Sequence, residues 1–131
     1  MAISAYTDEG KIELTYPANG DLSSDQYKAF KLDASEEADL CDAGNEKVFG
    51  VLQNKPEAQG ESATLRIAGV TLLKISETVT TGKLLTVTAS GLGEVCDAAN
   101  EEYFAIALAD GVANDLIPVL LQHGEVTATD A

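Results

Sequence analysis

The chain has 131 residues, of which 45% are apolar and 23% are charged, and its formal net charge is −14. This length and apolar content predict a single globular domain with a core of its own. With only 8 basic residues against 22 acidic ones, the charge argues against nucleic acid and anionic membranes as partners, because both are bound through clustered Lys and Arg.

Residues 1–10 have neither a basic start nor an apolar run. No signal peptide is therefore predicted, and the chain is expected to be made in the cytoplasm. The same residues show no hydrophobic period and are predicted to form an extended N-terminal arm. The longest apolar stretch, Leu116–Leu121, is too short to span a bilayer.

Short segments of alternating polar and apolar residues follow the arm, separated by Gly, Pro, Asn and Asp. In Lys11–Tyr16, the side chains of Ile12, Leu14 and Tyr16 should form the buried face of a first strand. Further strands are predicted at Tyr27–Leu32, Ala38–Cys41, Val48–Gln53, Ala63–Ile67, Lys83–Thr88, Glu94–Cys96, Tyr103–Leu108 and Leu116–Gln122. Closely spaced short strands of this kind are typical of an all-β barrel or sandwich.

The chain contains an internal repeat, because Tyr27–Val70 aligns without a gap onto Gly82–Glu125. Identical residues recur as Ala34-Ser35 and Ala89-Ser90, Cys41-Asp42-Ala43 and Cys96-Asp97-Ala98, Asn45-Glu46 and Asn100-Glu101, Phe49 and Phe104, Leu65 and Leu120, and Gly69 and Gly124. We expect two tandem copies of a four-strand unit that share one core, with both Phe and both Leu in equivalent buried positions.

The predicted organisation is therefore one β domain over 1–131. It comprises the arm at 1–10, repeat 1 at 27–70, repeat 2 at 82–125 and a flexible tail at 126–131.

The sequence offers no pattern for catalysis. His123 is the only histidine, and as Ala68 occupies its place in the first copy, an exposed strand-end position is expected. The acidic segments 42–46 and 97–101 could bind a cation in pairs, but they are more simply turns whose Asx side chains bond the local backbone. No catalytic, cofactor or metal site is predicted.

The two cysteines, Cys41 and Cys96, occupy equivalent places in the repeat, next to Leu40 and Val95. In a reducing compartment they should act as small buried hydrophobic side chains. A disulfide between the halves stays open, because sequence does not give the distance between them.

Several strand patterns resemble the capsid cement, or head-decoration, proteins of tailed phages. The patterns are Val48-Phe-Gly-Val-Leu52, Glu57-Ala-Gln-Gly60, Leu65-Arg-Ile-Ala-Gly-Val70, Gly82-Lys-Leu-Leu-Thr-Val87, Phe104-Ala-Ile-Ala107 and Ile117-Pro-Val-Leu-Leu121. The resemblance covers about Tyr27 to Gly124 and lies in the order of strand patterns rather than in chemical residues.

This resemblance implies a non-enzymatic virion protein that binds the outer surface of a mature phage capsid. It would bridge major capsid subunits, usually as a homotrimer, after synthesis in the host cytoplasm. The candidate capsid contacts are Ile3, Tyr6, Tyr16 and Pro17. Two alternatives remain from the residues themselves: a non-catalytic β-rich module that binds carbohydrate or protein, and a small hydrolase that uses paired acids.

Overall fold

The computed structural model describes residues 10–126, which contain nine β-strands and no helix. The strands are β1 (Ile12–Pro17), β2 (Ala29–Leu32), β3 (Ala38–Leu40), β4 (Gly50–Leu52), β5 (Ser62–Lys74), β6 (Leu84–Val87), β7 (Gly93–Val95), β8 (Glu102–Ala107) and β9 (Leu116–Glu125). The predicted all-β class is confirmed. Within 10–126 there is no helix that could cross a membrane.

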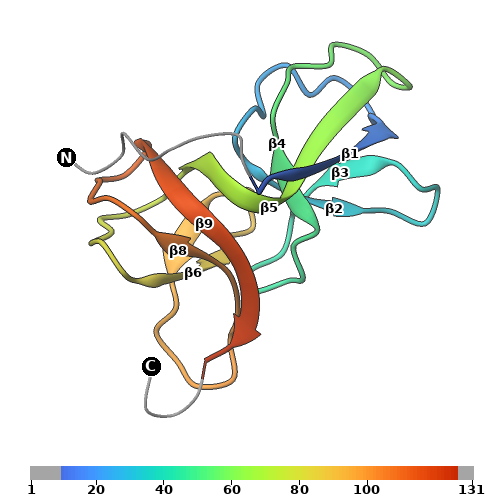
Figure 1. The fold of residues 1–131 in the computed structure, drawn as a ribbon. Coiled ribbons are helices and arrows are strands. Elements are labelled where there is room, and N and C mark those ends of the chain that lie inside the picture. Colours follow the sequence, from blue (N-terminus) through green and yellow to red (C-terminus); the bar gives the residue numbers. More distant parts are fainter. Residues whose placement is uncertain (1–9, 127–131) are drawn as a thin grey trace.

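All strands belong to one antiparallel sheet in the order β3-β2-β4-β5-β9-β8-β6-β7, with β1 pairing to β5. The two halves of this order correspond strand for strand, from β3 and β7 at the edges to β5 and β9 in the middle. The long strand β5 belongs to both halves. Its first part pairs with β1 and β4, and its second part pairs with β9. Figure 1 shows the resulting two lobes.

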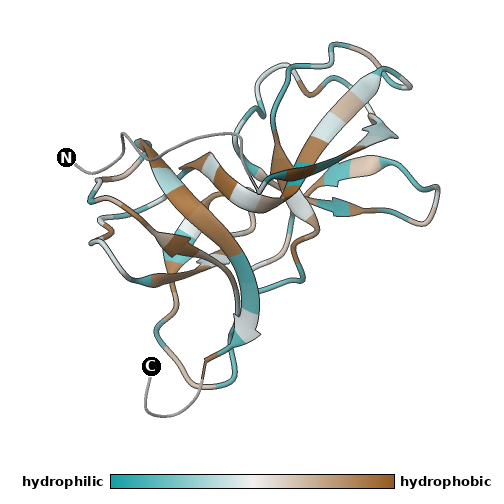
Figure 2. Ribbon diagram, viewed as in Figure 1, coloured by the Kyte–Doolittle hydropathy of each residue, from teal (hydrophilic) through white to brown (hydrophobic). Residues whose placement is uncertain are grey.

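Each half of the sheet curls until its ends meet. In lobe 1, which comprises β1 to β4 and the first part of β5, Ala18 forms a parallel bridge with Ala38. In lobe 2, which comprises the second part of β5 and β6 to β9, Ile75 forms a parallel bridge with Gly93. Figure 2 shows the hydrophobic residues gathered along β5, β8 and β9.

Loop hydrogen bonds occur in matching pairs in the two lobes. Asn19 N–H donates to the Ala38 carbonyl at 3.1 Å, and Ser76 N–H donates to the Gly93 carbonyl at 2.9 Å. β1 in lobe 1 thus has the same place as the second part of β5 in lobe 2. The structural correspondence begins one strand earlier than the sequence alignment, because the residues of these two strands have diverged.

The Asp-Ala-x-Asn-Glu turn is closed by its glutamate rather than by an Asx side chain. Glu46 Oε1 accepts hydrogen bonds from Asp42 N–H at 2.6 Å and Ala43 N–H at 3.1 Å. Glu101 makes the same pair of bonds in lobe 2, both at 2.8 Å. The preceding asparagines adopt left-handed backbone angles, with φ of 60° at Asn45 and 73° at Asn100, which Asn tolerates better than most residues.

The structure has two hydrophobic cores, so the expectation of one shared core is wrong. The core of lobe 1 contains Ala18, Leu22, Phe30, Ala38, Leu52, Ala63 and Leu65. The larger core of lobe 2 also takes in Ala29, Cys41, Val48 and Val51 from lobe 1. Neighbouring residues of β2 and β4 point to opposite faces of the sheet, which is why Phe30 and Ala29 belong to different cores.

The repeated aromatic and leucine positions are not equally buried. Phe104 is 2% exposed whereas Phe49 is half-buried, and Leu65 is fully buried whereas Leu120 is half-buried. A register shift between Tyr103 and Ala105 separates the two halves of the β8–β9 pairing. Leu52 pairs with Leu65 in lobe 1, whereas its counterpart Ala107 pairs with the fully buried Val119 in lobe 2. Val119 therefore has the place of Leu65, and the predicted equivalence of these pairs is wrong.

The last described residue belongs to the packed fold, although it was predicted to be part of a flexible tail. Val126 is 1% exposed, and its N–H donates to the Glu101 carbonyl at 2.8 Å. The rest of the predicted tail, 127–131, lies outside the described residues.

Both cysteines are buried and free. Burial raises the pKa of the Cys41 thiol to about 12, and the negative charge of Glu46 adds to the shift. The pKa of Cys96 is also raised to about 12, again mainly by burial.

The lobes meet where the β6–β7 hairpin of lobe 2 packs on lobe 1. Gly91 has a φ of 77° and its carbonyl accepts a hydrogen bond from Ala29 N–H at 2.8 Å. A Cβ added at Gly91 would lie 2.5 Å from Leu40 Cδ1. Glycine is therefore required here both by the backbone angle and by the closeness of lobe 1.

We expect Gly91→Ala to lower the free energy of unfolding by about 2–4 kcal/mol, which combines left-handed strain with overpacking against Leu40. Gly60→Ala is the control, because Gly60 also has a positive φ of 88° but nothing within 4 Å of an added Cβ. It should lose only about 1 kcal/mol. Urea denaturation of both variants measures the difference, and equal losses would contradict the packing of the lobes.

Candidate functional site

The first strand presents apolar side chains to solvent. Ile12 and Leu14 are 52% and 39% exposed, although they were predicted to be buried with Tyr16. Leu14 and Tyr16 pair with Leu65 and Ala63 of the lobe 1 core, and a register shift between Ile12 and Glu13 interrupts the pairing at Ile12. The predicted burial of Ile12 and Leu14 is therefore wrong, although Leu14 does lie on the side of β1 that faces the core. Beside them Arg66, which is 6% exposed, donates from Nε and Nη2 to Glu13 Oε2 at 3.0 and 2.7 Å.

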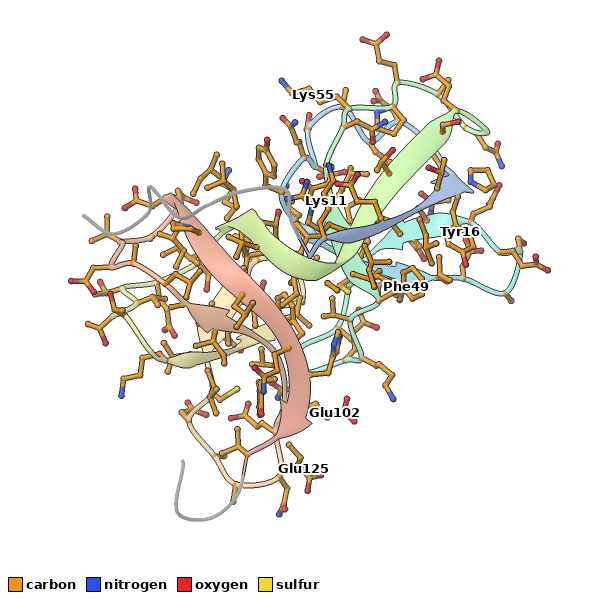
Figure 3. The ribbon with its side chains drawn as sticks, in the orientation of Figure 1. Lys11, Tyr16, Phe49, Lys55, Glu102 and Glu125 are labelled. Carbon is orange, nitrogen blue, oxygen red and sulfur yellow. The ribbon has the colours of Figure 1, made fainter. Side chains whose placement is uncertain are left out.

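Of the four candidate contact residues, two can be placed. The Tyr16 ring stands edge-on to the Phe49 ring, with their centroids 5.6 Å apart and an interplanar angle of 89°. Both residues are labelled in Figure 3. Pro17 is exposed at the end of the same strand. Ile3 and Tyr6 lie outside the described residues.

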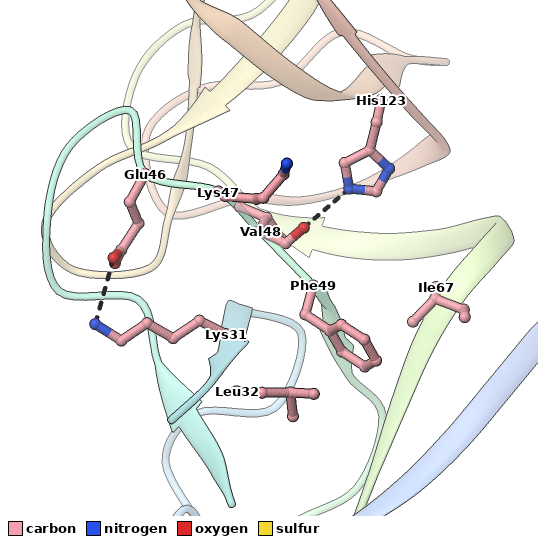
Figure 4. A pocket seen from close by; sticks show the side chains of 8 residues that line it. All are labelled: Lys31, Leu32, Glu46, Lys47, Val48, Phe49, Ile67 and His123. Atoms are coloured by element: carbon pink, nitrogen blue, oxygen red, sulfur yellow. Dashed lines mark hydrogen bonds and ion pairs between the residues drawn. The ribbon is translucent and has the colours of Figure 1, made fainter. Parts of the chain in front are cut away.

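Beside Tyr16, Phe49 also lines an open groove of about 640 Å³. Leu32 from β2, Phe49 from the segment before β4 and Ile67 from β5 supply its apolar side chains (Figure 4). The remaining lining residues are Lys31, Glu46, Lys47, Val48 and His123. We call the surface formed by the side chains of Leu14, Tyr16, Leu32, Phe49 and Ile67 the β1–Phe49 face.

Charged side chains at one end of the groove are held in place. Lys31 Nζ lies 2.7 Å from Asp42 Oδ1 and 3.3 Å from Glu46 Oε2, and the hydrogen bond to Asp42 raises the pKa of Lys31. Burial opposes the ionisation of Glu46, but hydrogen bonds from Ala43, Asp42 and Lys31 outweigh it and lower its pKa. Glu46 therefore both closes its turn and fixes Lys31.

His123 links the two lobes at the groove. It is exposed on β9 as predicted, and its Nε2 lies 2.9 Å from the carbonyl oxygen of Val48 in lobe 1. Because a carbonyl only accepts, Nε2 carries the proton in this bond. No pattern in the sequence indicates this contact, since Ala68 at the equivalent position of repeat 1 has no polar side chain.

The groove offers an apolar surface with lysines at its rim. Among residues 10–126, no three His, Cys, Asp or Glu side chains converge into a group that could hold a metal ion. A half-buried aromatic pair next to exposed aliphatic side chains is suited to contact with another protein surface.

A second hollow, of about 370 Å³, lies where lobe 1 meets the end of β5. Its lining includes Lys55 and Lys74 together with the hydroxyls of Ser23, Ser24 and Tyr27. It is a local concentration of cations on an otherwise acidic molecule, which favours an anionic group.

No family model matches this chain, and no curated protein matches it in sequence. Among solved structures, its fold is similar to that of the head fiber gp8.5 N base in bacteriophage phi29, with a TM-score of 0.63 and 15% sequence identity. The match covers 86% of this chain and 94% of the other. What these comparisons show is that the present chain has the β fold of the base of a phage head fiber.

Proposed function

We propose that this protein is a structural component of a tailed-phage virion that binds the outer surface of the mature capsid. One observation carries the proposal: the fold matches nearly the whole of a module described as the N base of a phage head fiber. The strand patterns that resemble head-decoration proteins support the same assignment independently of that likeness.

The charge of the chain favours the outer surface of the shell. Packaged DNA fills the interior with negative charge, and a protein with a net charge of −14 would be repelled from it. The same charge keeps a protein made in many copies in the host cytoplasm soluble before assembly.

The β1–Phe49 face is the surface we assign to the capsid. Leu14 is already exposed there, and Phe49 and Tyr16 are half-buried, so a partner could cover them without unfolding the chain. A standard protein interface buries about 800 Å² on each partner. We further propose that the major capsid protein is the partner, that several copies bridge its subunits as a homotrimer, and that no catalysis is involved.

Replacement of Leu14 on this face and of Ile12, which is exposed next to the face on β1, by Ser should weaken binding to purified capsids at least about tenfold, because it removes apolar contact area on and beside the assigned face. Their exposure in the free protein means that the melting temperature should change by only a few degrees. Co-sedimentation with shells that lack the protein measures the binding.

Val112→Ser is the matched control, since Val112 is 57% exposed but lies in lobe 2. It should bind like the unaltered chain. Equal binding by the double variant and the control would show that β1 does not contact the capsid. A failure of the unaltered chain to bind shells would overturn the proposed virion role.

Stabilisation of the shell is a separate part of the proposal. Many copies that bridge subunits multiply a modest affinity, so decorated particles should survive heating or osmotic shock that bursts bare ones. If the chain binds shells but leaves their survival unchanged, it is a capsid-bound component that does not stabilise the shell, and the proposed bridging of subunits is wrong.

A further inference from the structure

The second hollow, of about 370 Å³, is formed by both lobes. Lobe 1 supplies Ser23, Ser24, Gln26 and Tyr27 before β2 and Lys55 after β4, and lobe 2 supplies Lys74 at the end of β5 together with Asn114 and Leu116. All these residues differ from the described residues that line the groove of the β1–Phe49 face. The capsid contact assigned to that face therefore gives the second hollow no role.

The lining of the second hollow differs in charge from the rest of the chain. Its described residues include two lysines and no Asp or Glu, although the chain has 22 acidic residues and only 8 basic ones. The hydroxyls of Ser24 and Tyr27 and the side-chain amide of Asn114 add neutral groups that can donate hydrogen bonds. Two ammonium groups beside several neutral donors are complementary to an anion.

The acidic residues that flank this lining in the sequence are bound to donors of their own. Asp25 Oδ1 lies 3.0 Å from Lys28 Nζ. Asp21 Oδ1 accepts hydrogen bonds from Ser23 N–H at 3.0 Å and from the Ser23 hydroxyl at 2.7 Å. Asp115 Oδ2 accepts a backbone N–H of its own loop at 2.8 Å. These three carboxylates therefore do not belong to the lining.

The backbone that carries the hollow is held in an uncommon conformation. Tyr27 has a left-handed φ of 65°, which a bulky residue seldom adopts. Its N–H donates to the Leu52 carbonyl at 2.7 Å, and its carbonyl accepts Lys74 N–H at 2.9 Å. Asn114 has a φ of 72°, and its N–H donates to the Ile75 carbonyl at 2.7 Å. Such residues cluster at binding sites, where the surrounding structure fixes them before the ligand arrives.

The two lysines differ in their freedom to move. Lys74 is half-buried and pairs with Leu116 across β5 and β9, so the sheet fixes its position. Lys55 is exposed in the loop after β4, and its long side chain can move towards a ligand. Leu116 is 48% exposed and adds an apolar surface at the edge of the hollow. A ligand with an anionic group and a small apolar part matches this combination.

We propose that the second hollow binds a small molecule that carries phosphate or carboxylate oxygens. Lys55 and Lys74 neutralise its charge, and the hydroxyls of Ser24 and Tyr27 donate hydrogen bonds to it. The volume of the hollow lies at the small end of the range for ligand sites. This inference rests on the charge and geometry of the hollow and does not depend on the capsid-binding proposal.

Titration of the full chain, labelled with nitrogen-15, tests the proposal by nuclear magnetic resonance. The probes are inorganic phosphate and citrate, each added at constant ionic strength because salt screens general attraction. At least one of them should shift the amide signals of Tyr27, Lys74 and Leu116 and reach half-saturation below about 10 mM. The probe that binds more tightly identifies which of the two kinds of oxygen the site prefers.

Lys55→Gln and Lys74→Gln should each weaken this binding at least about fivefold, because each removes a charged hydrogen-bond donor from the lining. Lys83→Gln is the matched control. It removes the same charge, but Lys83 is exposed in lobe 2 and does not line the hollow, so the affinity should be unchanged. If Lys74→Gln does not fold, the comparison of Lys55→Gln with Lys83→Gln decides.

Shifts that grow linearly with both probes would overturn the proposal, and so would equal weakening by all three variants, because the lysines would then attract anions only in a general way. Signals of Tyr27 and Lys74 that change with protein concentration, without added anion, would also overturn it. In that case an acidic surface of a second copy fills the hollow instead of a small molecule.

Discussion

Phe104→Ala is expected to lower the free energy of unfolding by about 3–5 kcal/mol, which is the usual loss for a large aromatic side chain in a packed core. Phe104 is 2% exposed and belongs to the core of lobe 2. No solvent reaches the site to relieve the cavity that the substitution leaves. Urea denaturation followed by circular dichroism gives the difference.

The matched comparison is Phe49→Ala, at the equivalent position of the first repeat. Phe49 is half-buried beside Tyr16, so its truncation should cost only about 1–2 kcal/mol, because part of the ring is already in water. Phe49→Ala should also weaken capsid binding. Phe104→Ala, measured at a temperature at which this variant is still folded, should bind capsids like the unaltered chain. Equal losses of stability would contradict the unequal burial of the two rings.

Glu13→Gln is expected to destabilise the protein by about 2–4 kcal/mol. The Arg66 guanidinium is nearly buried, and loss of the Glu13 charge would weaken the two hydrogen bonds that Arg66 Nε and Nη2 donate to Glu13 Oε2. We place the effect below the upper end for buried pairs because the Glu13 side chain is 25% exposed. Chemical denaturation measures it.

Two variants control for this effect. Asp42→Asn breaks the ion pair with Lys31 at the surface, where Asp42 is 72% exposed, and it should change stability by less than about 1 kcal/mol. The double change Glu13→Leu with Arg66→Met replaces both charges by apolar groups and should recover most of the loss. A double variant as unstable as Glu13→Gln would show that the lost interaction between the Glu13 and Arg66 charges is not the cause.

Alternation and turn residues were sufficient to locate the strands, because the strands have a face towards a core and the segments between them contain Gly, Pro, Asn or Asp. They failed beyond Ile67, where the predicted strand Ala63–Ile67 ends shortly before Gly69. β5 in fact continues through it to Lys74. An added Cβ at Gly69 would lie 2.9 Å from Lys11 Cα, so this glycine makes room for a neighbouring chain segment rather than a turn, and a single sequence does not distinguish the two.

The candidate site was predictable only in part. Tyr16 was selected from the sequence, and the structure shows that it packs on Phe49 at the edge of the groove. The exposure of Leu14 and the contact of His123 with Val48 were not predictable. Both depend on how segments distant in the chain pack together, β1 on β5 and lobe 2 on lobe 1, and no local pattern encodes that packing.

The strand common to both lobes has a mechanical consequence. Because β5 is a single covalent segment that contributes backbone hydrogen bonds to each half, a force applied to one lobe reaches the other through peptide bonds rather than through a side-chain interface. Separating either lobe from β5 breaks backbone hydrogen bonds of a strand that also belongs to the other lobe. Under tension the molecule should therefore unfold in one step, and the two lobes should not unfold separately.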